Sequence, residues 1–113
     1  MKEVLIILRP KMYFPTKDAL SNAGFHSMTI REIIGRGKCP VQYEFDEGKE
    51  AKPRLVAKRM IDMYVRDEDV QFLIDTVVEV NKTNHAGDGK IFILPAKEAV
   101  RVRTAERGIE AIL

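Results

Sequence analysis

The order of hydrophobic patterns in this chain predicts an α+β domain in which an antiparallel sheet carries two helices on one face. Short apolar runs rich in branched residues alternate with two stretches of helical periodicity. A long polar segment without leucine or isoleucine separates the first strand-helix-strand unit from the second. With a short terminal strand added, this order is that of a split β-α-β, or ferredoxin-like, fold.

The first unit is predicted from three successive patterns. Residues 4–8 form a continuous apolar run, which favours a strand. Apolar side chains at helical spacing then predict a short helix over residues 12–23, and Gly24 stands where a helix terminator belongs. The branched residues of 28–34 predict the second strand.

The second unit begins with a strand predicted over residues 56–65. Asp67 is well placed to cap the helix that follows, and apolar residues at i, i+3 and i+4 mark one stripe of that helix. The helix is expected to fray over residues 81–84 and to lead into a turn at Gly87, before a strand over residues 91–94. The stripe consists of Val70, Leu73, Ile74, Val77 and Val78.

Residues 4–8 and 91–94 are apolar on both strand faces, although two helices can cover only one face of the sheet. Exposed apolar patches of that size are rare on monomers. We therefore expect other subunits to pack against the second face in a closed homo-oligomer. The alternative is that the C-terminal tail, residues 105–113, folds over it.

Length and composition fit one globular domain, residues 1–113, with 45% apolar and 32% charged residues. The formal charge of +2 is too mild to imply nucleic acid or an anionic membrane. Cys39 is the only cysteine, so no intrachain disulfide can form. No apolar run has membrane-spanning length, and the expected location is the cytoplasm without membrane insertion.

The polar segment, about residues 37–55, is too long for a simple connection in a compact domain. Alternation over residues 41–46 is also typical of a protruding hairpin. We favour a mobile loop that binds a protein partner, because binding residues are often carried on loops.

A polyphosphate site is predicted from the glycine turn Gly87–Lys90 together with Arg101 and Arg103. Glycines let main-chain N–H groups approach an anion. The two arginines alternate with valines on an expected strand, so their guanidinium groups would emerge on the same face. Further glycines and cations beside the long loop are Gly35, Gly37, Lys38 and Lys58.

Each of these pieces also has a plainer interpretation. The glycines would serve a tight helix-to-strand turn, since their spacing is not that of a P-loop. The arginines would form a solvated strand face. No catalytic or metal-binding constellation is recognised, because His26 and His85 are isolated in sequence.

Five short motifs support a family resemblance. They are Ala19-Leu20-x-x-x-Gly24, Met28-Thr29, Gly35-x-Gly37, Thr83-x-x-x-Gly87-Asp88-Gly89-Lys90-Ile91-Phe92 and Val100-Arg101-Val102-Arg103-Thr104. Over about residues 1–108 the chain resembles the P-II nitrogen-regulatory signal proteins. The resemblance implies a homotrimer that binds ATP or ADP between subunits and docks its long loop onto a target.

The resemblance also implies residue roles. Thr29 and Asp62 would line the adenine side, and Lys58 would pair with 2-oxoglutarate. Around the phosphates, Gly37 and Lys38 of one subunit would meet the glycine turn and the arginines of the next. The full set of expected binding residues is Thr29, Gly35, Gly37, Lys38, Lys58, Asp62, Gly87, Asp88, Gly89, Lys90, Arg101 and Arg103.

Three positions depart from the family pattern. Cys39 replaces the glutamine that holds Mg²⁺ together with 2-oxoglutarate, and a thiol is a poor ligand for a hard cation; Gln42 is an available substitute. Lys38 replaces a phosphate-binding arginine and loses the bidentate fork. Ala51 stands where the family carries the tyrosine that is uridylylated. The Gly-Arg-Gly-Lys turn resembles the nitrogenase-linked branch.

We therefore predict a non-enzymatic sensor of nitrogen and energy state. Its target would be nitrogenase, an ammonium transporter or glutamine synthetase, and a mixed assembly with a paralogue stays open. One alternative is a ferredoxin-like enzyme acting on a phosphorylated substrate, which needs a general base that we do not locate. Another is an RNA-binding sheet, which needs exposed aromatic residues, whereas Phe92 is expected in the core.

Overall fold

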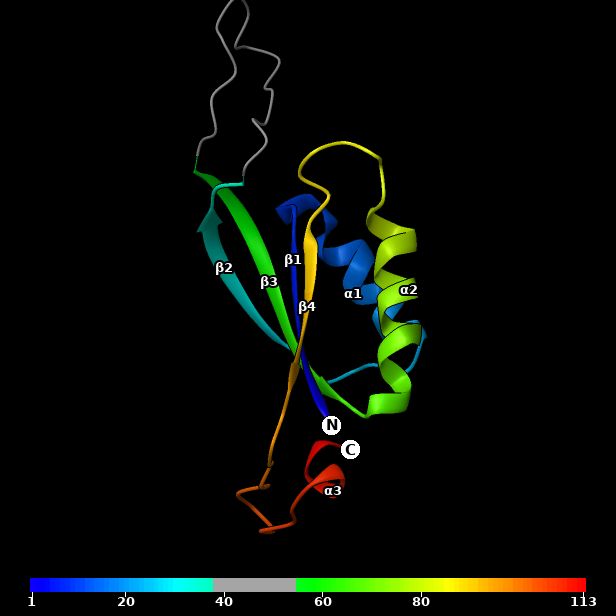
Figure 1. The fold of residues 1–113 in the computed structure, drawn as a ribbon, viewed down its shortest axis with the longest axis vertical. Coiled ribbons are helices and arrows are strands. Elements are labelled where there is room, and N and C mark those ends of the chain that lie inside the picture. Colours follow the sequence, from blue (N-terminus) through cyan, green and yellow to red (C-terminus); the bar gives the residue numbers. More distant parts are fainter. Residues whose placement is uncertain (38–54) are drawn as a thin grey trace, which may run out of the picture.

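The computed structural model describes residues 1–37 and 55–113. Four strands form one antiparallel sheet in the order β2-β3-β1-β4. Figure 1 shows both long helices, α1 and α2, on the same side of that sheet. The elements are β1 (Lys2–Leu8), η1 (Pro10–Met12), α1 (Tyr13–Asn22), β2 (Thr29–Gly35), β3 (Val56–Val65), η2 (Asp67–Asp69), α2 (Val70–Asn81), β4 (Lys90–Pro95) and α3 (Ile109–Ile112), where η denotes a 3₁₀ turn.

This architecture confirms the predicted α+β, ferredoxin-like fold. Strand β1 lies between β3 and β4, so β2 and β4 form the edges of the sheet. The third strand has the predicted bounds, and the second strand is shifted by one residue from the prediction. Both helices agree with the prediction to within about one turn. The predicted loop of residues 37–55 lies outside the described residues, apart from its two ends.

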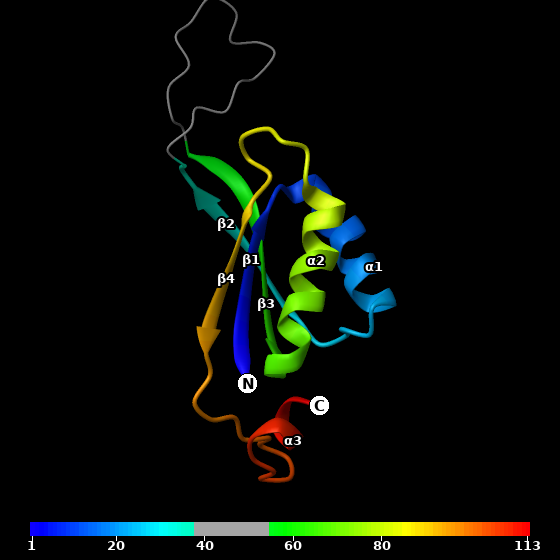
Figure 2. The same ribbon diagram turned by 45° about the vertical axis from the view of Figure 1, so that its right-hand side comes forward.

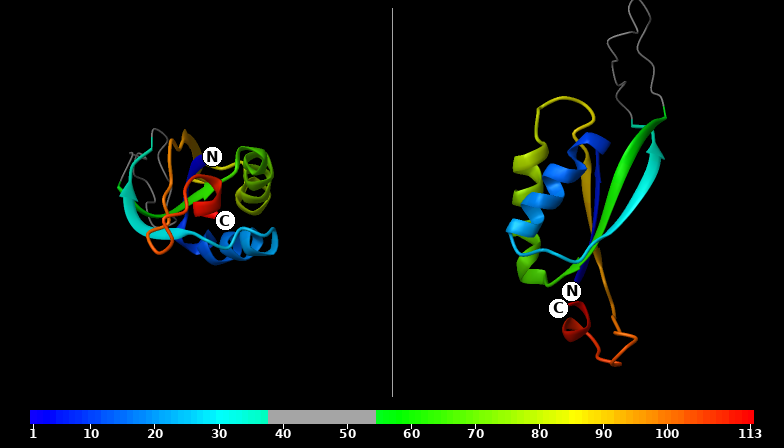
Figure 3. Two further views of the ribbon diagram at one scale, coloured as in Figure 1. Left: turned by 90° about the horizontal axis from the view of Figure 1, so that it is seen from below. Right: turned by 180° about the vertical axis from the view of Figure 1, so that it is seen from behind.

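The hydrophobic core lies between the sheet and the two helices. Alternate residues of β1 and β3 point toward the helices, as the period of a strand requires, and the helices contribute three leucine and valine side chains. The left panel of Figure 3 shows sheet and helices as two separate layers. The buried apolar residues are Val4, Ile6, Leu8, Leu20, Ile61, Met63, Val65, Leu73 and Val77.

A buried polar pair joins the two helices. Thr16 of α1 is fully buried, and Asn81 at the end of α2 is 6% exposed. The Asn81 Nδ2 group donates to Thr16 Oγ1 and to the Val77 carbonyl oxygen, both at 2.9 Å, and Thr16 Oγ1 donates to the Met12 carbonyl at 2.6 Å. α2 ends at Asn81, which agrees with the predicted position of the helix end, but this end is not frayed, because the Asn81 side chain fastens it to α1.

The prediction that Asp67 caps α2 is also wrong. Its carboxylate accepts a hydrogen bond from the Met1 ammonium group at 2.7 Å and lies 3.8 Å from Lys2 Nζ. A charged donor forms a stronger hydrogen bond than a backbone N–H. The chain instead enters α2 through the η2 turn, where Arg66 Nε donates to Asp69 Oδ2 at 2.9 Å.

The predicted strand that contains Arg101 and Arg103 is not formed. Beyond β4, the chain reverses in a turn closed by an isolated bridge between Val100 and Arg107. Ala105 adopts a positive φ of 62° in this turn, and its N–H donates to the Arg101 carbonyl at 2.7 Å. A tight reversal of this kind removes the strand alternation that would place both arginines on one face.

The C-terminal tail does not cover the second face of the sheet. In Figure 1 and in the right panel of Figure 3, α3 lies beyond the end of the sheet nearest the N-terminus. The alternative that residues 105–113 fold over the second face of the sheet is therefore wrong. Among the described residues, the helices also lack the length and apolar character needed to span a bilayer.

We expect Thr16→Val to lower the free energy of unfolding by about 1–3 kcal/mol, because it removes a buried partner from Asn81. Chemical denaturation at neutral pH measures this change. Thr76→Val is the matched control, since Thr76 Oγ1 makes the same type of bond, to the Phe72 carbonyl at 2.8 Å, on the exposed side of α2. Equal effects of the two substitutions would contradict a structural role for the buried pair.

Candidate functional site

Within residues 1–37 and 55–113, one face of the sheet carries no helix, as Figure 2 shows on the side away from α1 and α2. The strand registers place the alternate residues of all four strands on this open face. The face mixes apolar side chains with acids and bases. Its residues are Glu3, Leu5 and Ile7 of β1; Thr29, Arg31 and Ile33 of β2; Lys58, Met60, Asp62 and Tyr64 of β3; and Lys90, Phe92 and Leu94 of β4.

Phe92 belongs to this open face and not to the core, which corrects the sequence-based expectation. It pairs with Leu5 in the register and is 46% exposed, and Leu94 is 38% exposed. The apolar neighbours of Phe92 in the sequence made it look like a core residue. The parity of β4 decides otherwise, because Ile91 and Ile93 pair with the core positions of β1.

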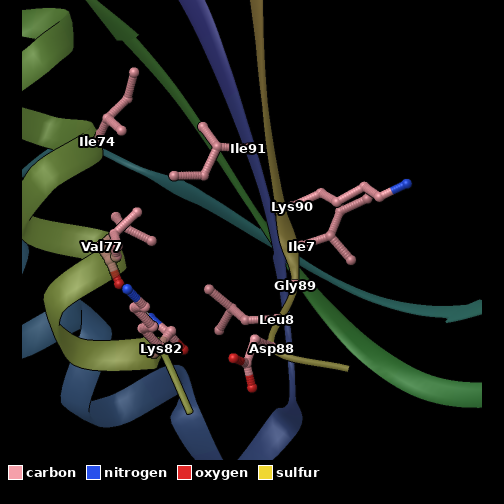
Figure 4. A pocket seen from close by; sticks show the side chains of 11 residues that line it. Ile7, Leu8, Ile74, Val77, Lys82, Asp88, Gly89, Lys90 and Ile91 are labelled. Carbon is pink, nitrogen blue, oxygen red and sulfur yellow. The ribbon is translucent and has the colours of Figure 1, made fainter. Parts of the chain in front are cut away.

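Two predicted site cations, Lys58 and Lys90, lie near the same end of the sheet. Lys90 pairs with Ile7 in β1, and Figure 4 shows its side chain on the side of β4 away from α2. Burial lowers the pKa of the Lys58 ammonium, and the positive charge of Arg9 lowers it further. Arg9 is thus a third cation at this end of the sheet.

The glycines of the preceding loop meet a steric need. Gly87 and Gly89 have positive φ values of 96° and 119°. A Cβ atom on Gly89 would overlap the Ile7 carbonyl oxygen, and one on Gly87 would lie 3.1 Å from Arg9 Nη2. The loop therefore runs directly against the end of β1, which agrees with the plainer interpretation of a tight helix-to-strand turn.

Asp88 holds this loop together from inside. Its carboxylate accepts hydrogen bonds from Arg9 Nη1 at 2.8 Å, from the Thr83 N–H at 2.7 Å and from the Asn84 N–H at 3.1 Å, and it also bonds the Thr83 hydroxyl. These bonds hold the pKa of Asp88 well below its ordinary value. The charged form of Asp88 is thus committed to the loop, not presented to a ligand.

Arg9 is a residue that the sequence reasoning missed. Besides Asp88, it bonds the Ala86 carbonyl oxygen through Nη2 at 2.8 Å, so it links the end of β1 to the loop. The available signal was its position: an arginine directly after a buried strand, followed by Pro10, stands at the end of that strand. Its partner lies 79 positions further along the chain, which sequence spacing does not reveal.

Thr29 and Asp62 are brought together as direct neighbours in the β2–β3 register. Asp62 Oδ1 is buried without a hydrogen-bond partner among the described residues. Burial raises the pKa of Asp62, and Glu3 raises it further through a hydrogen bond and its negative charge. A buried acceptor without a donor is rare in folded proteins, and the amino group of a bound ligand could satisfy it.

Arg101 and Arg103 do not join the other predicted residues within one chain. Figure 1 shows the turn that carries them at the opposite end of the sheet from the loop of residues 83–89. Arg101 is instead bonded to Glu106 and to carbonyl groups of the tail. Gly35 is the last residue of β2 and Gly37 follows the strand, at the loop end of the sheet, while Lys38 lies outside the described residues.

A pocket of about 390 Å³ opens between α2 and the start of β4, as Figure 4 shows. Its walls are mainly apolar, from Leu8, Ile74, Val77 and Ile91, and its charged lining residues are Lys82, Asp88 and Lys90. Within residues 1–37 and 55–113, the acidic, histidine and cysteine side chains form no group of three suited to a metal ion. Cys39, Gln42 and Ala51 lie outside the described residues.

These features define a ferredoxin-like α+β protein whose candidate binding residues lie on the open face and at the loop end of its sheet. The sequence pattern of the family described as Nitrogen regulatory protein P-II matches residues 1–106. This chain belongs to the P-II family of nitrogen regulatory proteins. P-II proteins are regulators and not enzymes, which sets aside the alternative of an enzyme acting on a phosphorylated substrate.

Individual relatives are similar over nearly the full chain. A nitrogen fixation nifHD region GlnB-like protein 2 of Methanobacterium ivanovii is 41% identical over 122 residues, covering all of both chains. A nitrogen regulatory protein P-II 2 of Methanothermobacter thermautotrophicus is 41% identical over 112 residues, covering 99% of this chain and 97% of the other. The solved structure of Arabidopsis thaliana PII bound to citrate matches with a TM-score of 0.77 at 32% identity, covering 98% and 88%.

We expect Gly89→Ala to lower the free energy of unfolding by at least about 2 kcal/mol, because the side chain is strained at positive φ and meets the Ile7 carbonyl. Thermal or chemical denaturation measures the loss. Gly35→Ala is the control, since a Cβ there has no described atom within 4 Å and φ is not positive. A fully stable Gly89→Ala protein would contradict the close approach of the loop to β1.

The Asp88 bonds predict a pH dependence of stability. Because folding lowers the pKa of Asp88, its stabilising effect is present above about pH 3.8, the ordinary value, and is lost as the pH falls below it. Asp88→Asn should therefore be less stable than the wild type at pH 6, with a smaller difference at pH 3. Urea denaturation at both pH values measures this, and Asp75→Asn, which removes an exposed carboxylate bonded to Gln71, is the control. A difference independent of pH would contradict the assignment.

Proposed function

We propose that this P-II protein binds ATP or ADP between copies of the chain and controls a nitrogen-metabolism target through residues 37–55. The observation that carries the proposal is the buried Oδ1 of Asp62, which has no hydrogen-bond partner in the described part of the chain and belongs to the residue directly opposite Thr29 on the open face. This oxygen can accept a hydrogen bond from a ligand, and family resemblance assigns both Asp62 and Thr29 to the adenine side of the site. The exocyclic amino group of adenine is a donor of the required kind.

The phosphate side of the site draws on two regions. The glycine loop and Lys90 lie at one end of the sheet, and the turn with Arg101 and Arg103 lies at the other. β4 alone, six residues long, separates them by roughly 17 Å of extended chain. A nucleotide can meet both groups only if they come from different copies. Lys38 is expected to join them, and Gly35, Gly37, Gly87 and Gly89 to leave room for the phosphates.

This division supports a homotrimer, the assembly that P-II proteins form. The open face presents half-exposed apolar side chains such as Phe92 and Leu94, which are costly to leave in water. Packing copies around these faces would cover them and would bring the two phosphate-binding regions together. Assembly with a paralogue through the same face is compatible with this arrangement.

A second ligand, 2-oxoglutarate, is proposed at the loop end of the sheet. Lys58 is half-buried there, with Arg9 near enough to lower its pKa, so this end favours an anion. The Arabidopsis relative was solved with citrate, also a polycarboxylate. With Cys39 in place of an oxygen ligand, the usual mode bridged by Mg²⁺ is not expected unless Gln42 substitutes.

The target is proposed from the relatives. Their names place them in the nifHD region of nitrogen fixation, so nitrogenase is the favoured target, ahead of an ammonium transporter or glutamine synthetase. Each ligand would bias the target-binding residues by its different affinity for their conformations. Such a regulator is expected to act in the cytoplasm.

We expect Arg101→Ala/Arg103→Ala to weaken ATP and ADP binding by at least about 100-fold, since charge-assisted hydrogen bonds contribute roughly 1.5–3 kcal/mol each. Isothermal titration calorimetry on the full chain measures the affinities. Arg107→Ala is the matched control, because Arg107 is an exposed arginine of the same turn that pairs with Glu98 at 3.4 Å. Unchanged affinity in the double variant would remove the proposed phosphate site.

A further inference from the structure

The guanidinium group of Arg101 is already engaged by acceptors of its own chain. Nη1 donates to Glu106 Oε1 at 2.9 Å, and Nη2 donates to the carbonyl oxygens of Glu110 and Leu113, both at 2.9 Å. Nη2 carries two hydrogens, so both of its donors are used. The fork that family resemblance assigns to a phosphate is thus filled by the tail of the same chain.

The segment that supplies these acceptors, residues 106–113, is held in a defined conformation. The Arg101 N–H donates to the Glu106 carbonyl at 2.8 Å, and the Thr104 hydroxyl donates to Glu106 Oε1 at 2.7 Å. Gly108 has φ 67° and ψ −139°, a combination that other residues rarely adopt. Glu106 is therefore aimed at Arg101 by the backbone and by a second side-chain bond.

The end of the tail also borders a pocket. Ile112 and Leu113 line a pocket of about 400 Å³ together with Phe25, Val65 and Phe72, at the end of the sheet and helices. Figure 2 shows α3 next to this end of the molecule. The tail is thus held by its polar bonds to Arg101, and its end lies beside this pocket, with Leu113 70% exposed.

We propose that residues 106–113 are an internal competitor for the nucleotide: while the tail is docked, Glu106 and the tail carbonyls occupy the donors of Arg101 that a phosphate group needs. This inference rests on the proposed nucleotide site. A carboxylate and a phosphate recognise the same guanidinium fork, so a single Nη1–Nη2 edge cannot serve both. Nucleotide binding and tail docking then exclude each other, and the phosphate releases the tail from Arg101.

Arg103, the second arginine of the proposed phosphate site, makes no polar contact with the tail among the described residues. It is exposed in the same turn, and the described residues include no ion pair or hydrogen bond to its side chain. Competition therefore acts on Arg101 alone. A phosphate can first bind Arg103 and then displace Glu106 from Arg101.

The test is ATP titration calorimetry on the full chain in four forms: wild type, Glu106→Gln, Gly108→Ala and Glu110→Gln. Glu106→Gln weakens the competitor, and partly exposed ion pairs of this kind are worth up to about fivefold in an equilibrium constant, so ATP should bind about two- to fivefold more tightly. Gly108→Ala strains the tail where a Cβ has no described atom within 4 Å, and about tenfold tighter binding is expected.

Glu110→Gln is the control, because it removes the same charge from the same segment while only the backbone carbonyl of Glu110 contacts Arg101. Its affinity for ATP should stay close to that of the wild type. Equal tightening in Glu110→Gln and Glu106→Gln would overturn the competition in favour of a general charge effect. Wild-type binding without any tightening in Glu106→Gln or Gly108→Ala would also overturn it and leave the proposed function intact.

Hydrogen exchange of residues 106–113 gives a second readout that does not depend on affinity. Saturating ATP should speed exchange at the N–H groups of Gly108 and Ala111, which bond the Ala99 and Gly108 carbonyls in the docked tail. Slower or unchanged exchange there would overturn the release of the tail. Absence of ATP binding in all four forms would instead overturn the proposed function, and the competition with it.

Discussion

The contact between the end of β1 and the loop of residues 83–89 is the constraint on which the candidate site depends. Arg9, directly after the strand, donates a hydrogen bond to Asp88 of the loop, and Asp88 accepts hydrogen bonds from N–H groups of the loop. Gly89 lets the loop backbone approach the Ile7 carbonyl closely. These bonds fix where β4 begins and which of its side chains turn toward the open face. Without that register, Lys90 would not stand on the same face as Lys58.

The other residues of the candidate site are positioned by different interactions. Thr29 and Asp62 meet through the pairing of two neighbouring strands, with Asp62 partly removed from water and close to a second acid, Glu3. Arg101 is positioned by a turn and by the tail, away from the sheet. One chain therefore contains three separate groups of binding residues, and only an arrangement of several chains can combine them.

Much of the fold could be predicted from sequence because it follows from periodicity. The strand of residues 56–65 and the apolar stripe of α2 are predicted from simple spacing rules. The structure confirms the strand and buries Leu73 and Val77 of the stripe, whereas Val78 is 44% exposed. Side-chain partners far apart in sequence could not be predicted. The Met1 ammonium takes Asp67 from its expected capping role, and the reversal at Ala105 replaces the expected strand. Both outcomes are set by tertiary contacts, which local patterns do not encode.

The edge position of β4 ties the stability of the fold to the amount of protein present. Phe92 and Leu94 stay in contact with water as long as a molecule is alone, and any second copy that covers them binds the folded form and not the unfolded chain. By mass action, such binding raises the apparent melting temperature as the concentration rises. Dilution would therefore lower the apparent melting temperature even when the ligand concentration is unchanged.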